Sequence, residues 1–284
     1  MTTYAVTGAT GHLGALAIEA LLEKGVPAGD VVAVVRDAGR AAALAARGVQ
    51  VRTADYTQPG TLQAAFAGVD RLLLVSGNEV GRRIAQHGNV IDAAKETGVG
   101  LIAYTGITRA DTTGSPLAPE HKATEELLAA SGVPHTLLRN NWYVENYTAQ
   151  LADYLARGAI VAAAGEGRVA GAARRDYAEA AAVVLTGEGH AGRSYELAGT
   201  PFTFKELAAT ISEASGREVE YRPVGPGELI GILTGAGLDE GTAGFVVALD
   251  ESIARGDLDI ESTDLPELLG RPLTPVADVV RAAL

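Results

Sequence analysis

The stretch YAVTGATGHLG at residues 4–14 decides how the rest of the chain is interpreted. A short apolar run ends at Thr7, and glycines follow at positions 8, 11 and 14. Strand, glycine-rich turn and helix, in that order, form the unit that binds a pyrophosphate at a helix N-terminus. Gly8 would permit the sharp turn, Gly11 the approach of the pyrophosphate, and Gly14 the packing of helix on strand. Because the spacing differs from GxGxxG, the surrounding sequence must support this prediction.

The sequence around this turn alternates between strand and helix patterns. Near-continuous apolar runs are typical of parallel strands buried on both faces. We predict such strands at 3–7, 31–35, 49–54, 71–76, 101–105 and 135–139. Helices are predicted between them at 13–25, 39–48, 61–68, 81–98 and 121–132, several of which end at glycine. This alternation predicts an α/β fold, a doubly wound parallel sheet of the Rossmann type, over residues 1–140.

The rhythm changes beyond residue 140. The segment NNWYVENY at 140–147 holds the only tryptophan, and a Gly/Ala-rich stretch follows. Helices are predicted at 175–187 and 203–216, the second with Thr203 as N-cap and Glu206 completing a capping box. Strands are predicted at 193–199 and 218–224, followed by a helical remainder. Residues 141–284 are therefore expected to form a smaller α/β portion on the substrate side, intertwined with the first and covering the cleft.

Composition excludes several classes of function. The formal net charge of -12 repels phosphate backbones, so nucleic acid is not expected as a partner. There is no cysteine, which excludes disulfides, thiolate nucleophiles and cysteine-ligated metals. The histidines show no metal-binding spacing, and no metal is predicted. No apolar run is long enough for a membrane span, and no signal peptide is recognised. We expect a cytoplasmic protein, monomeric or homodimeric, that acts on a small molecule.

The end of the second strand bears on the choice of cofactor. NAD-binding folds usually place an acidic residue there, whereas this chain has Arg36 followed by Asp37. A guanidinium at that point can hold the 2′-phosphate of NADPH in a bidentate contact. The alternative is that Arg36 is a solvated surface charge and Asp37 binds the ribose of NADH. The sequence favours NADPH, with NADH possible.

Several motifs together resemble a known family. They are TGATGHLG at 7–14, VVRD at 34–37, TADY at 53–56, LLLVS at 72–76 with EVGRR at 79–83, LIAYT at 101–105, TLLRNNWYVENY at 136–147 and RRDYAEAA at 174–181. This combination resembles the NmrA-like branch of the atypical short-chain dehydrogenases, and within it the bacterial type 2 NAD(P)H:quinone oxidoreductases. The resemblance implies reduction of quinones with NADPH and without flavin. Other members of the branch are non-catalytic sensors of NADP(H) that bind regulatory proteins.

The resemblance also implies a cofactor site. Pyrophosphate, adenosine, ribose and nicotinamide would be contacted by Gly8, Ala9, Thr10, Gly11, His12, Leu13, Arg36, Asp55, Tyr56, Ser76, Gly77, Asn78, Thr105, Asn140, Trp142, Tyr143, Glu145 and Arg174. Most of these positions follow a predicted strand, where ligands of parallel α/β sheets bind. For Ser76 and Asn78, turn chemistry after a strand is the alternative. His87 and His190 are expected to be solvated.

The chain lacks the Tyr-x-x-x-Lys pair of ordinary short-chain dehydrogenases, because no tyrosine has a lysine four residues later. Tyr104 and His121 are the catalytic candidates implied by the resemblance, His121 standing where some relatives have a lysine. Asn146 could polarise an acceptor oxygen, and Trp142, Tyr143 and Tyr147 offer either aromatic faces or core packing. Quinone reduction suits this set, since a dihydroquinone needs less help from a proton donor than an alcohol does. The alternatives are an NADP(H)-sensing regulatory protein and a reductase of a small biosynthetic carbonyl or enone.

Overall fold

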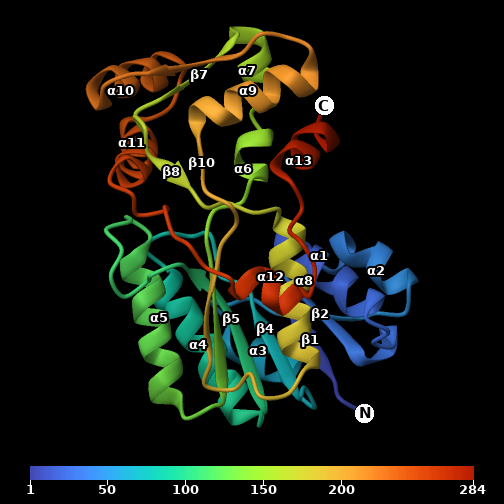
Figure 1. The fold of residues 1–284 in the computed structure, drawn as a ribbon. Coiled ribbons are helices and arrows are strands. Elements are labelled where there is room, and N and C mark those ends of the chain that lie inside the picture. Colours follow the sequence, from blue (N-terminus) through green and yellow to red (C-terminus); the bar gives the residue numbers. More distant parts are fainter.

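The computed structural model describes residues 1–284 and is built around one parallel sheet (Figure 1). Its strand order is β3-β2-β1-β4-β5-β6-β9, and every neighbouring pair is parallel. The strands are β1 (Tyr4–Val6), β2 (Val31–Val35), β3 (Gln50–Thr53), β4 (Arg71–Leu74), β5 (Leu101–Ile107), β6 (His135–Asn140) and β9 (Ser194–Leu197). The order reverses between β1 and β4, which is the switch point where doubly wound sheets bind ligands. The predicted Rossmann fold is confirmed.

Helices cover both faces of this sheet. One face carries α1 (His12–Glu23), α8 (Arg174–Thr186) and α12 (Asp264–Leu269), whose apolar side chains share one core with β1 and β2. The other face carries α3 (Pro59–Phe66), α4 (Arg83–Glu96) and α5 (Ala118–Ser131) over a second core. The short helix α2 (Ala42–Ala46) and the 3₁₀ turns η1 (Ala28–Asp30) and η2 (Ala38–Ala41) flank β2. Two buried layers explain the apolar runs: all five residues of β2 are buried.

A second group of elements lies over the carboxyl ends of the strands, in the upper half of Figure 1. It contains β7 (Ala159–Ala162) paired with β11 (Glu220–Pro223), and β8 (Arg168–Val169) paired with β10 (Phe202–Thr203). Its helices are α6 (Glu145–Thr148), α7 (Leu151–Arg157), α9 (Phe204–Ser215), α10 (Pro226–Gly235), α11 (Glu240–Ala254) and α13 (Val276–Ala282). The capping box predicted at Thr203 and Glu206 is present at the start of α9. No helix combines the length and apolarity that crossing a bilayer requires.

The chain passes between the two groups more than once. After β7 and β8 it returns to the sheet through α8 and β9, and β9 pairs with β6. The strand predicted at 193–199 therefore extends the main sheet, although it follows residue 140 in sequence. A division of the chain at residue 140 remains a prediction of the sequence.

Candidate functional site

A cavity of about 700 Å³ lies at the carboxyl ends of the strands, which is within the range of small-molecule sites. Its wall includes the glycine turn, the ends of β2 to β6 and the start of α8. Most of the predicted site residues line it: Gly8, Thr10, Gly11, His12, Leu13, Arg36, Asp55, Tyr56, Ser76, Gly77, Asn78, His121, Asn140, Trp142, Tyr143, Asn146 and Arg174. One continuous cavity thus brings together residues that are far apart in the sequence.

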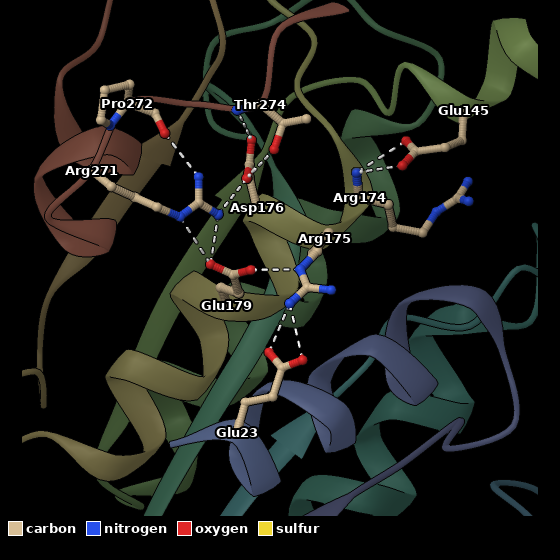
Figure 2. Close-up of polar contacts among 9 residues, drawn as sticks. All are labelled: Glu23, Glu145, Arg174, Arg175, Asp176, Glu179, Arg271, Pro272 and Thr274. Carbon is tan, nitrogen blue, oxygen red and sulfur yellow. Dashed lines mark hydrogen bonds and ion pairs between the residues drawn. The ribbon is translucent and has the colours of Figure 1, made fainter. Parts of the chain in front are cut away.

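Four predicted residues lie outside the cavity wall. Ala9 is buried in the core against α1, and Thr105 supports the wall from behind, because its Oγ1 accepts a hydrogen bond of 2.9 Å from the Ser76 backbone N–H. Glu145 accepts two bonds from the Arg174 backbone N–H, at 2.9 and 3.0 Å, at the start of α8 (Figure 2). Tyr104 is fully buried among α3, α4 and α5. Alternate residues of a strand face opposite sides, so β5 directs Tyr104 into that helix layer, away from the cavity.

The glycine turn has the geometry that the sequence predicts. Gly8 has a φ of 57°, the left-handed conformation that glycine adopts without strain. A Cβ on Gly14 would lie 2.3 Å from the Gly8 carbonyl oxygen, so no side chain fits between α1 and the turn. Gly11 is the N-cap of α1 and faces the cavity. The free N–H groups at this helix N-terminus therefore point at a site suited to an anion.

The end of β2 presents two cations to the cavity. Arg36 is exposed and lies 3.5 Å from the Glu79 carboxylate, and Arg40 lines the same region. The Asp37 carboxylate accepts a hydrogen bond of 2.8 Å from the Gly39 N–H, which caps the turn η2. Arg36, Asp37 and Arg40 all line the cavity, and one carboxylate oxygen of Asp37 is engaged by the turn. Arg40 was not predicted from the sequence, because it lies beyond the end of the strand.

Asp55 and Tyr56 follow β3 and form part of the cavity wall. The Tyr56 hydroxyl donates to Thr7 Oγ1 at 2.6 Å or to the Val75 carbonyl at 3.0 Å, and burial raises its pKa above the ordinary range. Asp55 accepts bonds of 2.7 Å from both the N–H and the hydroxyl of Thr57, which lower the pKa of its carboxyl. Both residues line the cavity while fixing the loop after β3.

The opposite end of the cavity holds Asn140, Trp142 and Asn146. Asn140 Oδ1 and Trp142 Nε1 are buried without any hydrogen-bond partner in the protein. Both atoms have almost no accessible surface, so a ligand in the cavity would reach them only after the wall rearranges. Tyr147, by contrast, packs between Phe202 and Phe204 in the core of the upper group. The core alternative thus holds for Tyr147.

Arg174 connects this wall to the start of α8. Its guanidinium lies 4.9 Å from the centre of the Tyr143 ring and donates to Asn146 Oδ1 at 3.2 Å. A guanidinium only donates, so the Asn146 carbonyl faces Arg174 and the Asn146 Nδ2 remains available to a ligand. Its neighbour Arg175 points away from the cavity and pairs with Glu23 and Glu179 (Figure 2).

His121 is a buried imidazole in the wall of the cavity. It lines the cavity, and its Nδ1 lies 2.7 Å from the Tyr104 hydroxyl. Burial and the nearby charge of Arg83 lower the pKa of His121 to about 3, so the ring is neutral near pH 7. His121 is therefore available as a hydrogen-bonding group and not as a cation. Tyr104 contacts it from behind the wall.

The structure overturns the expectation that His87 is solvated. Its side chain is fully buried, and burial together with Arg83 lowers its pKa to about 3. Arg83 and Gln86, from the same helix, line the cavity and were not identified from the sequence. The sequence contained one usable signal, the clustering of Arg83, Gln86 and His87 on one side of α4. No group of three or more potential metal ligands is present.

Comparison with known proteins gives consistent results. Residues 2–236 match the NmrA-like family. The chain is 46% identical over 277 residues to quinone oxidoreductase 2 of Escherichia coli, covering 97% of this chain and 96% of that one. The crystal structure of the NADPH-dependent quinone oxidoreductase of Escherichia coli with NADPH superposes with a TM-score of 0.95, at 46% identity and 99% coverage of both chains.

A second solved structure is nearly as similar. Triphenylmethane reductase of a Citrobacter species, in complex with NADP(H), has a TM-score of 0.94 at 43% identity. The match covers 99% of this chain and 100% of that one. The likeness extends over the sheet and the elements above it. With the family match spanning most of its length, the chain belongs to the NmrA-like family.

Proposed function

We propose that this protein is an NADPH-dependent reductase that passes a hydride directly to quinones, without a bound flavin. The observation that carries the proposal is the single cavity that joins a glycine turn to a wall of hydrogen-bonding and aromatic groups. The quinone oxidoreductase and the NADPH complex among the relatives support it. When bound, NADPH supplies the hydride, and with one further proton the quinone becomes the hydroquinone while NADP⁺ remains.

Different parts of the cavity would bind the phosphates and position the reacting rings. The N-terminus of α1 would hold the pyrophosphate, and Arg36 with Arg40 the 2′-phosphate. Asn140 and Trp142 would line the wall beside the bound molecules. Positioning two planar rings at near-attack distance supplies a large part of such catalysis.

Two groups would polarise the acceptor. Arg174 engages the Asn146 Oδ1, and the Asn146 Nδ2 would then donate to a quinone oxygen. Tyr104 would donate to His121 Nδ1, which places the ring proton on Nε2 as a second donor. Donors held in place before the reaction stabilise negative charge as it develops on the quinone oxygens. A strongly electrophilic acceptor reduced this way needs no Tyr-x-x-x-Lys pair.

Cofactor preference gives the first prediction. Arg36→Ala should weaken NADPH binding by roughly tenfold to a hundredfold, the loss of a charge-assisted contact worth about 1.5–3 kcal/mol, and leave NADH binding unchanged. The fluorescence of Trp142, the chain's only tryptophan and part of the cavity wall, would measure binding as each cofactor is titrated into the protein. Arg47→Ala, which removes an exposed pair with Glu19, is the control. An unaltered preference for NADPH over NADH would show that Arg36 does not read the phosphate.

The second prediction concerns Asn146. Asn146→Ala should lower kcat roughly fivefold to thirtyfold, because the loss of a polarising donor raises the activation free energy by about 1–2 kcal/mol. NADPH affinity should change much less. Gln58→Ala, which removes an exposed amide outside the cavity, should leave both quantities unchanged. Equal losses in cofactor affinity and kcat would assign Asn146 to the cofactor instead.

The proposed function is tested with the purified protein and NADPH against quinones, enones and aldehydes. We expect oxidation of NADPH by quinones, slowing of the chemical step when the transferred hydrogen is deuterium, and no flavin absorbance. Triarylmethane dyes belong in the panel because a relative at 43% identity is a triphenylmethane reductase. Turnover of enones or aldehydes alone would favour the biosynthetic reductase. Binding of NADPH without turnover of any acceptor would overturn the enzyme and favour the NADP(H)-sensing alternative.

A further inference from the structure

The loop between β4 and α4, residues 75–82, forms one edge of the cavity, and its backbone is held by buried side chains. The Gly77 N–H donates to His87 Nε2 at 3.0 Å, and the Gly77 carbonyl accepts from Arg83 Nε at 2.8 Å. Both backbone groups of one cavity-lining residue are thus engaged by α4. Farther along, the Gly81 N–H donates to Glu120 Oε1 at 2.9 Å. The loop is therefore fastened at two points to two different helices.

The side chains that hold the loop are themselves buried and connected. His87 is fully buried and Arg83 is 4% exposed. His87 Nδ1 lies 3.0 Å from Thr124 Oγ1, whose hydroxyl donates to the Glu120 carbonyl at 2.8 Å. Arg83 Nη1 lies 3.4 Å from Glu120 Oε2, an ion pair in which neither atom makes a hydrogen bond. Burying an arginine and a histidine costs free energy unless they are paired, and here the hydrogen bonds of Arg83 Nε and His87 Nε2 go to the backbone of the loop.

The tautomer of His87 follows from these contacts. A backbone N–H can only donate, so Nε2 must accept from Gly77 and the ring proton must lie on Nδ1, directed to Thr124. Only a neutral imidazole can do this. A protonated ring would place two N–H groups against each other at Gly77.

We propose that His87 and Arg83 are positioning residues for the dinucleotide, holding residues 76–78 in the shape that receives the cofactor. This inference rests on the proposed NADPH site. His87 acts only through Gly77, because it does not line the cavity, whereas Arg83 holds the Gly77 carbonyl and also lines the cavity. A loop that is already fixed before binding raises the affinity for the cofactor, because no binding free energy is lost in ordering the loop.

The experiment compares two substitutions of His87. His87→Gln keeps an acceptor near the position of Nε2, whereas His87→Leu removes it and leaves the Gly77 N–H without a partner. We expect His87→Leu to weaken NADPH binding at least tenfold, read by Trp142 fluorescence, and to leave the quinone KM at saturating NADPH within twofold. His87→Gln should recover most of the lost affinity. His190→Leu, a histidine bonded to Tyr195 Oη at the far edge of the sheet, should change nothing.

The outcomes separate this inference from the function it rests on. If the unaltered protein does not bind NADPH, the proposed function fails first. If it binds NADPH, and His87→Leu binds equally well or His87→Gln binds as poorly as His87→Leu, the positioning role is overturned. Should His87→Leu not fold, ¹⁵N NMR of the unaltered protein decides: the inference requires an unprotonated Nε2 and a protected Gly77 amide, and a proton on Nε2 contradicts it.

Discussion

Replacing Gly11 with valine should abolish measurable NADPH binding in a protein that still folds. Gly11 has a φ of -82°, which valine can adopt, and a Cβ there would meet only the Gly8 carbonyl oxygen at 3.1 Å. This contact needs a shift of a few tenths of an ångström in the turn, much less than the shift that a Cβ at Gly14 would need. The branched side chain would nevertheless occupy the space where the pyrophosphate approaches the helix N-terminus. We expect affinity to fall at least about a hundredfold, which is ~3 kcal/mol.

The matched comparison is Gly14→Ala. A Cβ at Gly14 would lie 2.3 Å from one backbone atom of Gly8 and 2.8 Å from another, so α1 would have to move away from β1. Overpacking of this kind costs about 1–3 kcal/mol of stability. Thermal unfolding should therefore separate the two variants: Gly14→Ala melts earlier, and Gly11→Val melts near the original temperature. A folded Gly11→Val protein that retains its calorimetric NADPH affinity would reduce the turn to a structural element.

The sequence predicted the sheet well because burial on both faces leaves a local mark. The β2 run VVAVV is apolar throughout and is buried throughout. The position of β9 left no such mark. Its pairing with β6 joins segments more than fifty residues apart, and α8, which packs against α1, and α12, which contacts β9, accompany that pairing. Local pattern predicts a strand, whereas its neighbour in the sheet depends on long-range contacts.

The site was predicted best where backbone geometry dictates the residue. The glycine turn and the strand ends fall into this class, because parallel α/β sheets place ligands there. His87 and Arg83 fall outside it: a polar residue on a helix usually faces solvent, and their clustering with Gln86 on one side of α4 does not show that this side faces a loop. Tyr104 and Thr105 were assigned to the same cavity, yet consecutive strand residues face opposite sides. Side-chain alternation alone would have separated those two roles.

The largest expected loss of stability comes from the polar cluster at the start of α8. Asp176 is fully buried and accepts bonds from Arg271 Nη2 at 2.7 Å, from the Thr274 N–H at 2.9 Å and from the Thr274 hydroxyl at 2.9 Å (Figure 2). These contacts attach the segment after α12 to the helix that carries Arg174. Arg271→Met should lower the free energy of unfolding by about 2–4 kcal/mol, because it leaves the Asp176 charge buried without its cation, and the loss stays below that of a fully buried pair because the Arg271 side chain is 37% exposed.

The same cluster supplies the control and the decisive comparison. Arg175→Met removes a guanidinium of similar reach, but its pairs with Glu23 and Glu179 are partly exposed, so the loss should stay below about 1 kcal/mol. Asp176→Asn in the Arg271→Met background removes the stranded charge and should restore part of the lost stability. That non-additivity would identify the buried carboxylate as the cause. Urea unfolding measures the unaltered protein, Arg271→Met, Arg175→Met, Asp176→Asn and the double variant, and a double variant no more stable than Arg271→Met would instead place the cost in the packing of the Arg271 side chain.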